Sequence, residues 1–497
     1  MLINYTGHGN TTSWSDENVL TLPMIDKFSY PKLPLWITAT CDFCRFDALA
    51  TSAGESIFLN EKSGGIALYT TVRVAYGSEN DRINNSFLEK LFDQSMYPAL
   101  GDVVRSVKAD NKSLRSKNLN FTFIGDPALK LALPSHKIRI NTINGKDAVQ
   151  NSTNFRAYDE VTVEGEILAP DNSIIDNFNG KLEVKVMDSK IEITTRNNFR
   201  NDTAFKYMDY KNLVYKGSTQ VQNGKFSFSF YVPGNISYSG KAGKMILYAS
   251  DSEQKIEAKG NFTNYKVQGT SDDPLDDHEG PEIVKLYLND STFVSGDKVN
   301  TTPFFYARLW DQTGVDITEG GVGHDVMLMI DNKPFTSYNL NSYYDNIFGR
   351  KGEGEVRFGI PQLSAGQHEA VFKVWDVMGN PTTYTFRFEV DESLKPFITN
   401  IVATPTPAKG NVEFHLTHNR PESQMKVGIM VYDIAGRLHW KHEETGSSEL
   451  FKDYVIDWDL RNNSGSHVRP GVYIYRAAIS TNNSKEATEA KKMIILW

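Results

Sequence analysis

The spacing of hydrophobic residues along the chain changes near residue 134. Before that point, short apolar runs alternate with segments in which apolar residues recur at helical spacing. This alternation predicts an α/β layer built on a parallel sheet. The expected strands are Leu2–Tyr5, Leu35–Ala39 and Gly65–Tyr69, and the expected helices are Asn84–Gln94, with Phe87, Leu88, Leu91 and Phe92 on one face, and Ala99–Lys112, with Val103, Val104 and Val107 facing inward.

From Ser135 onward, apolar and polar residues alternate with a period of two, as in Lys181–Met187 and Lys225–Val232. Asn-Gly and Pro-Gly pairs separate such runs, which is typical of antiparallel strands in β-sandwiches. An acidic, turn-rich stretch at 269–281 predicts a linker. We therefore expect a multidomain chain, with an α/β domain at 1–134 followed by three all-β, Ig-like sandwiches at 135–268, 282–392 and 396–497.

The second predicted sandwich contains the pattern Trp-Asp-x-x-Gly twice, at 310–314 and at 375–379. Asp and Gly favour turns, because the Asp side chain accepts nearby backbone N–H bonds and Gly tolerates positive φ. Each copy therefore predicts a strand end followed by a turn.

Composition excludes several classes of protein. The chain has 497 residues, 40% of them hydrophobic and 23% charged, which is typical of folded domains. A net charge of -8 without a Lys/Arg cluster argues against a nucleic-acid partner. We find no apolar stretch of about 20 residues, so we expect no inserted span. The two cysteines, Cys41 and Cys44, cannot form a disulfide framework.

The chain enters its first apolar run one residue after Met1. Either this run is an edge strand, or the chain begins inside a larger domain whose earlier strands and signal peptide lie upstream.

Two reactive side chains follow predicted neighbouring strands. His8 lies in Tyr5-Thr-Gly-His-Gly9, and Cys41 lies in Ile37-Thr-Ala-Thr-Cys-Asp-Phe43. Ligands bind outside the carboxyl ends of the strands of an open parallel sheet, so these loops can meet there. His8 would lower the thiol pKa of Cys41 and protonate the leaving amine. The N–H groups of Gly9 and Cys41 would form an oxyanion hole.

Simpler interpretations of both motifs stay open at this point. Gly-His-Gly also occurs as a tight turn, and a buried Cys is usually a small apolar filler. Cys41 and Cys44 form a Cys-x-x-Cys, which could indicate a redox pair or half of a zinc site. A redox pair would open a helix in a small βαβ domain, and zinc would need two more ligands, so we expect Cys44 to serve packing.

Other candidate ligands are isolated in the sequence. His278, His324 and His439 stand alone, and we expect them to be ordinary surface or hydrogen-bonded histidines. The run Asp272–Asp277 could bind calcium through carboxylates, but it lacks the spacing and glycine of an EF-hand. We interpret it as a solvated linker and expect no cofactor.

The motifs around His8 and Cys41 resemble those of the gingipain-type cysteine peptidases, in which a strand ending in Gly-His-Gly precedes a strand ending in the nucleophilic Cys. Segments at 54–59, 64–68 and 123–129 resemble parts that close the catalytic domain of that family. The resemblance covers residues 1–134 and implies a caspase-like α/β fold. Family members also carry an upstream half with the acidic partner of the His, so we expect this chain by itself to be nearly inactive.

Within that family, the whole layout resembles the sortase of the type IX secretion system, through 40–43, 45–47, 279–283 and 321–325. The last domain resembles C-terminal sorting domains through 432–436 and 470–473. The resemblance implies that cargo C-terminal signal domains are cleaved at the cell surface, beside outer-membrane secretion components. The acyl-enzyme would pass to water or to a lipopolysaccharide amine. The rival hypothesis is a non-catalytic surface or adhesion protein with an inactive peptidase remnant.

Overall fold

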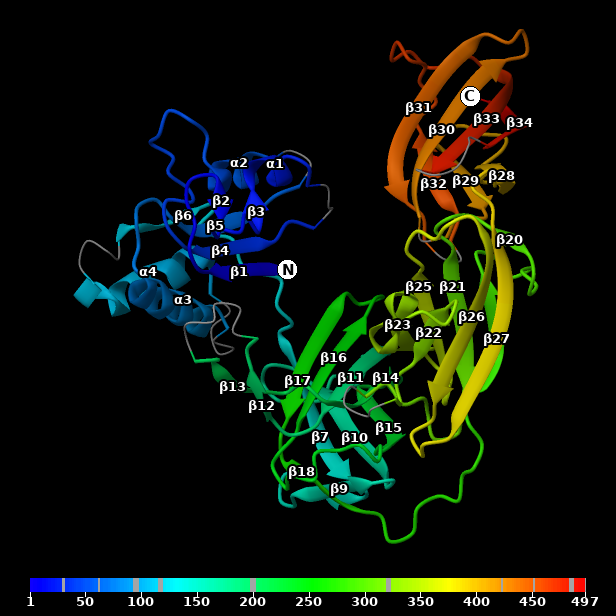
Figure 1. Cartoon of the computed structure of the whole chain (residues 1–497). Helices are drawn as coiled ribbons and strands as arrows, with labels where there is room; N and C mark the ends of the chain where they lie inside the picture. The colour runs from blue at the N-terminus through cyan, green and yellow to red at the C-terminus, as the bar shows by residue number, and fades with distance from the viewer. Residues whose placement is uncertain are drawn as a thin grey trace. The chain divides into compact units, whose positions relative to one another are not determined.

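A computed structural model describes residues 1–28, 32–60, 63–92, 98–114, 119–196, 203–318, 323–421, 423–449, 452–481 and 487–496. The chain divides into two compact units, Met1–Ser135 and His136–Trp497, and each is described by itself (Figure 1). Gln94, Trp497 and residues 321–322, which appear in the sequence predictions, lie outside the described residues.

The first unit is built on a four-stranded sheet in the order β1-β4-β5-β6. Its strands are β1 (Leu2–Thr6), β4 (Leu35–Ala39), β5 (Ala67–Thr71) and β6 (Phe121–Ile124). The first three strands are parallel, and β6 runs antiparallel to β5. The three predicted strands are thus parallel as expected, and the sheet has one further, antiparallel strand that was not predicted. A short hairpin, β2 (Ser13–Trp14) and β3 (Leu20–Thr21), follows β1.

Helices cover both faces of this sheet, as Figure 1 shows. They are α1 (Leu22–Ile25), α2 (Ala53–Leu59), α3 (Gly77–Leu91), α4 (Leu100–Asp110) and the 3-10 turn η1 (Lys112–Leu114). Ile37 of β4 packs in the cluster with α3 and α4, and its neighbour Trp36 packs with α1 and α2. Alternate residues of a strand thus reach opposite helical layers.

Helix α3 begins seven residues before the predicted start at Asn84. In the part before Asn84, the buried positions are held by Asn80 and Ile83, so the apolar period that marks a helix is too weak to be seen there. Phe92, expected on the inner face, follows the helix and is 45% exposed.

The second unit begins with a sheet that closes on itself. Its strands are β7 (His136–Ile143), β8 (Lys146–Asp147), β10 (Glu160–Leu168), β11 (Gly180–Met187), β14 (Leu213–Gln222), β15 (Lys225–Tyr231), β16 (Lys244–Asp251) and β17 (Ile256–Phe262). β10 pairs with β15 on one side and β7 on the other, with a register shift at Gly165. A Cβ at Gly165 would lie 2.3 Å from Arg139 O, so the bend requires glycine.

Two small sheets complete this segment, β9 (Thr153–Ala157) with β18 (Tyr265–Thr270) and β12 (Ile191–Thr194) with β13 (Lys206–Asp209). The β9–β18 and β7–β17 pairs are parallel. The expected two-sheet antiparallel sandwich is thus a single closed sheet here. The alternation of apolar residues is the same in both arrangements, because each strand buries one face in either case.

The next segment is a sandwich of two sheets. One contains β19 (Glu282–Leu288), β21 (Phe304–Trp310), β25 (Glu353–Gly359) and β24 (Tyr344–Asn346), and the other contains β20 (Lys298–Val299), β27 (Pro381–Val390), β26 (Gly366–Trp375), β22 (Met327–Ile330) and β23 (Ser337–Asn339). β21 and β26 end at the tryptophans of the two Trp-Asp-x-x-Gly patterns, and Gly314 and Gly379 have positive φ, which confirms the predicted turns.

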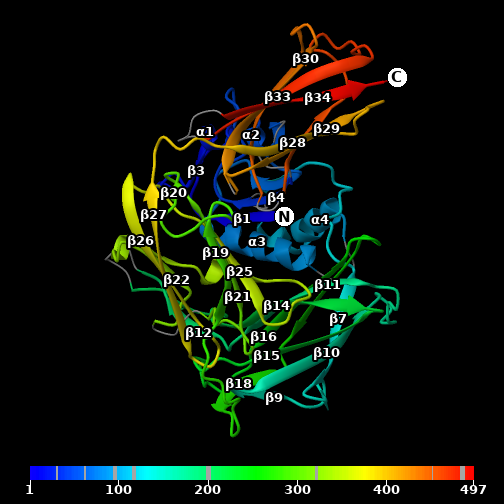
Figure 2. The same ribbon diagram turned by 90° about the vertical axis from the view of Figure 1, so that its right-hand side faces the viewer.

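The last segment is also a two-sheet sandwich (Figure 2). Its sheets are β28 (Ile398–Thr404), β29 (Val412–His418) and β32 (Tyr454–Trp458), and β31 (Leu438–Ser447), β30 (Gln424–Asp433), β33 (Gly471–Thr481) and β34 (Ala487–Ile495). The described part of residues 136–496 contains only two helical turns, η2 (Pro334–Thr336) and η3 (Asn341–Tyr343). No described helix of the chain has the length and apolar character of a membrane span.

Candidate active site

Parallel pairing of β1 with β4 brings the two predicted reactive residues to one edge of the sheet. The register places Tyr5 opposite Thr38 and Thr6 opposite Ala39. Gly7 N–H continues the pairing by donating to Ala39 O at 3.2 Å. His8 and Cys41 each follow two residues after the end of their strand. Their loops therefore leave the sheet side by side.

Both glycines beside His8 lie where a side chain would collide. A Cβ at Gly7 would approach the Tyr5 hydroxyl oxygen to 2.7 Å. A Cβ at Gly9 would lie 2.4 Å from Thr40 Oγ1 and 2.9 Å from Ser13 O. The Gly9 backbone therefore packs directly against the residue that precedes Cys41. Close backbone approach, rather than unusual φ, explains these glycines.

The hairpin after His8 fixes the direction of the Gly9 backbone. Gly9 pairs with Trp14 as an isolated antiparallel bridge. The hydrogen bonds that flank this pair run from Ser15 N to His8 O, at 2.7 Å, and from Asn10 N to Ser13 O, at 3.0 Å. Bonds in these positions identify Gly9–Trp14 as a non-hydrogen-bonded pair of the ladder. The hairpin therefore leaves the Gly9 N–H available to another acceptor.

The Cys41 thiol is half-buried and points to the loop that follows β5. Its Sγ donates to Ala75 O at 3.2 Å. The next residue, Asp42, has a φ of +53° and donates its N–H to Arg73 O, so the chain turns sharply directly after the thiol. Loops from three neighbouring strands, β1, β4 and β5, thus surround Cys41.

The His8 side chain is exposed, and within the described part of the chain its ring makes no hydrogen bond, to Cys41 or to any other residue. Catalytic hydrogen bonds often form only when substrate is bound, so this geometry keeps the pair as a candidate. Glu17, in the turn of the β2–β3 hairpin, lies within electrostatic range. A hydrogen bond from the Ser15 hydroxyl lowers the pKa of Glu17, and His8 lowers it further by a smaller amount.

Cys44 is more deeply buried than Cys41. It is 1% exposed and packs against Gly54, where a Cβ would lie 2.6 Å from the Cys44 Cβ. Burial raises the pKa of the Cys44 thiol to about 11. The predicted packing role is therefore confirmed. The Cys-x-x-Cys does not open a helix, since the next helix, α2, begins at Ala53.

The three isolated histidines all have local neighbours. His324 stacks on Trp375 with ring centroids 4.3 Å apart. His278 lies 3.0 Å from Asp276, and His439 lies 3.1 Å from Asp433. Each of these rings thus has a neighbouring side chain as its contact.

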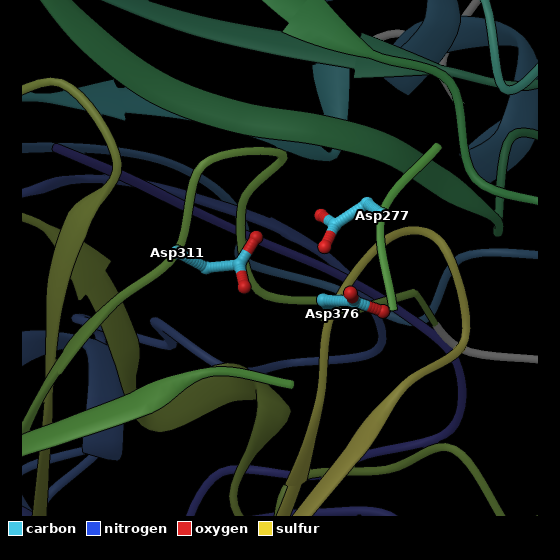
Figure 3. A group of neighbouring side chains, drawn as sticks. All are labelled: Asp277, Asp311 and Asp376. Atoms are coloured by element: carbon cyan, nitrogen blue, oxygen red, sulfur yellow. The ribbon is translucent and has the colours of Figure 1, made fainter. Parts of the chain in front are cut away.

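The acidic linker is solvated along most of its length but not at Asp277. Figure 3 shows Asp277 beside Asp311 and Asp376, the aspartates of the two Trp-Asp-x-x-Gly patterns. One ligand oxygen from each lies within 4.8 Å of the others. Asp277 O also accepts a hydrogen bond from the Asn380 side chain at 3.1 Å. The linker is thus anchored at this end, which the run of acidic residues did not reveal.

Comparison with known proteins assigns the first unit. Residues 1–132 match the model of peptidase family C25. This match covers the first unit almost to its end at Ser135. The resemblance to gingipain-type cysteine peptidases is thereby confirmed, and the site described above lies wholly inside the C25 domain. No curated protein sequence matches the chain.

Solved structures similar to the chain include PorU, gingipain R and part of a large adhesion protein. The crystal structure of dimeric latent PorU from Porphyromonas gingivalis is 31% identical, with a TM-score of 0.38, and the match covers 100% of this chain and 46% of that one. Gingipain R, an Arg-specific cysteine proteinase, is 17% identical with a TM-score of 0.25, covering 54% of this chain and 53% of that one. A tandem repeat of a large adhesion protein is 13% identical with a TM-score of 0.18, covering 72% and 74%. The chain thus spans about half the length of PorU and of gingipain R.

Two residues of the C25 site had no assigned role in the sequence predictions. Glu17 lies in the turn of the β2–β3 hairpin, some way after His8 in the sequence. Only the folding of that hairpin brings Glu17 near the His8 imidazole. Tyr5 was assigned to the strand alone, although its hydroxyl donates to His8 O at 2.6 Å. Its place three residues before His8 is the one signal that the sequence offered.

Proposed function

We propose that this chain supplies the nucleophile and the general acid–base of a cell-surface cysteine endopeptidase, and that the whole protein is a sortase of the type IX secretion system. The observation that carries the proposal is the juxtaposition of the His8 and Cys41 loops at one sheet edge of a C25 domain. PorU, the similar structure, and the sorting-domain motifs near the C-terminus support the finer assignment.

In the proposed reaction, the Cys41 thiolate attacks the carbonyl carbon of the scissile peptide bond. The carbon–oxygen π electrons move to oxygen, and the N–H groups of Gly9 and Cys41 stabilise that oxyanion. Collapse of the tetrahedral intermediate breaks the C–N bond, and protonated His8 gives its proton to the leaving amine. Water or an amine then attacks the thioester carbonyl carbon and gives a proton to His8, which is now neutral. The C–S bond breaks and releases the Cys41 thiolate, which leaves a free carboxylate after attack by water or a new amide after attack by an amine.

The proposed substrate is a secreted cargo protein that carries a C-terminal signal domain. The proposed acyl acceptor, besides water, is an amino group of an anionic lipopolysaccharide. Peripheral attachment at the outer-membrane surface, beside other components of the secretion system, would place the C25 domain next to both. We propose no cofactor for this chemistry, because Cys41 and His8 supply every bond-forming and proton-transfer group.

Reactivity of the thiols tests the nucleophile. We expect iodoacetamide to alkylate Cys41 much faster than Cys44 near neutral pH, as mass spectrometry of peptides would show. A thiol with a pKa of about 11 has a thiolate fraction of about 10⁻³ at pH 8, and Cys44 is in addition buried. His8→Ala should slow Cys41 and leave Cys44 unchanged. Equal labelling of the two thiols in the parent chain would contradict the proposal.

Cleavage of a cargo protein tests the substrate. The whole protein should cut a purified cargo before its C-terminal signal domain, this chain by itself should cut it far more slowly, and the Cys41→Ala variant of either should not cut it. Mass spectrometry of the new C-terminus distinguishes transfer to water from transfer to an added amine. Folded protein that shows neither Cys41-dependent cleavage nor selective alkylation of Cys41 would instead support a non-catalytic surface protein.

A further inference from the structure

We propose that Tyr5 is a positioning residue, which holds the His8–Gly9 peptide so that the Gly9 N–H faces the oxyanion. This inference rests on the proposed function, because it concerns the geometry of the oxyanion hole. Two donors meet on a single acceptor, His8 O: the Tyr5 hydroxyl at 2.6 Å and Ser15 N at 2.7 Å.

The direction of the Gly9 N–H follows from these two hydrogen bonds. The C=O of His8 and the N–H of Gly9 belong to one peptide group, and in a trans peptide they point in opposite directions. A donor pair that holds the carbonyl therefore also fixes the N–H. A flipped peptide would aim the carbonyl oxygen at the site, where it would repel an oxyanion.

Tyr5 is itself held firmly for this role. Its ring stacks on Trp14 with centroids 4.3 Å apart and an interplanar angle of 4°. Gly7 leaves the space that the hydroxyl occupies, because a Cβ there would lie 2.7 Å from the hydroxyl oxygen. Burial and the charge of Glu17 raise the pKa of Tyr5, so the hydroxyl remains a hydrogen-bond donor over the physiological pH range. Tyr5, Gly7 and Gly9 thus act together on one peptide group.

Two probes separate the oxyanion hole from the nucleophile. A peptide aldehyde binds when the Cys41 thiolate adds to its carbon and the aldehyde oxygen becomes an oxyanion, so its affinity depends on the Gly9 N–H. Alkylation by iodoacetamide depends on the thiolate and needs no oxyanion hole. Substitution of a residue that only supports the fold would lower both the aldehyde affinity and the alkylation rate of Cys41. Substitution of a residue that orients the Gly9 N–H would lower the aldehyde affinity alone.

The experiment compares Tyr5→Phe with the parent chain, using tripeptide aldehydes with a neutral and with a basic terminal side chain. Phe keeps the stacking on Trp14 and removes only the hydroxyl. We expect aldehyde affinity to fall about tenfold, the loss typical of one hydrogen bond, and the alkylation rate of Cys41 to stay within about twofold. Tyr69→Phe is the matched control, because the Tyr69 hydroxyl has no hydrogen-bond partner among the described residues.

Gly7→Ala should break the same hydrogen bond, from the Tyr5 hydroxyl to His8 O, because the new methyl group would displace the hydroxyl. It should reproduce the effect of Tyr5→Phe, and it keeps the test decisive if one variant does not fold. Unchanged aldehyde affinity in both variants, or an equal loss of alkylation and aldehyde binding, would overturn the role of Tyr5. Because this chain by itself is expected to be nearly inactive, the parent and both variants are compared in the whole protein. A parent form of the whole protein that gives no Cys41-dependent aldehyde complex would overturn the proposed function itself, which is a separate result.

Discussion

Asp311→Asn tests whether the three clustered aspartates oppose folding of the 282–392 sandwich when they are charged. Asp311 is 4% exposed, and burial raises its pKa to about 6, with the nearby Asp376 contributing. No ion pair joins Asp277, Asp311 or Asp376 to a Lys, Arg or His in the part of the chain that the structure describes. An asparagine keeps the oxygen that accepts the Thr313 and Gly314 N–H bonds and removes only the charge.

The sign and size of the effect follow from the shifted pKa. A carboxyl group whose pKa rises on folding binds its proton more tightly in the folded state, so its protonation favours folding. Stability from this group is therefore greatest below about pH 4 and is lost as the pH rises through about 6. The shift of about two units corresponds to about 3 kcal/mol. Asp311→Asn should be more stable than the parent at pH 7.5 by up to that amount, and equal to it below pH 4.

Urea unfolding in EDTA, read by pulsed hydrogen exchange within residues 282–392, measures this free energy in the whole chain. EDTA removes divalent cations that would neutralise the carboxylates. Asp391→Asn is the matched control within the same segment, because Asp391 forms the same type of turn with Ser393 but has a lowered pKa, so its substitution should not stabilise. An Asp311→Asn chain that is less stable than the parent at pH 7.5, or that has the same pH dependence, would refute the reasoning.

Three further substitutions test the C25 domain. Gly9→Ala should abolish Cys41-dependent aldehyde binding, because the new Cβ would lie 2.4 Å from Thr40 Oγ1; binding at parental affinity would contradict this. Ser52→Ala should lower the free energy of unfolding of this unit by about 1 kcal/mol in urea titrations, since Ser52 precedes α2 and bonds to Glu55. Cys44→Ala should leave the alkylation rate of Cys41 unchanged while reducing stability, and a slower rate would indicate that Cys44 shares in the chemistry.

The sequence by itself determined the class of each segment and the candidate pair. Apolar runs such as Leu35–Ala39 are buried on both faces, and that burial alone requires a covered α/β sheet. Alternation with a period of two predicted β structure after residue 135, because each such strand buries one face. The Gly-His-Gly motif and the scarcity of cysteine are enough to single out His8 and Cys41 as the candidate reactive pair.

Tertiary structure decided which distant groups meet. The sheet that contains β7 and β17 is closed because β10 pairs with a strand on each of its two edges. The sequence could not show this, because a strand that buries one face has the same alternation of apolar and polar residues in an open and in a closed sheet. The Asp277–Asp311–Asp376 group joins residues far apart in the chain, which no local spacing records. Likewise, the hydrogen bond from Tyr5 to His8 O exists only because the β2–β3 hairpin folds back and Gly7 leaves room for a hydroxyl. The local pattern of apolar and polar residues indicates which side chains are buried. The direction of the His8–Gly9 peptide group, by contrast, depends on contacts that form only in the folded chain.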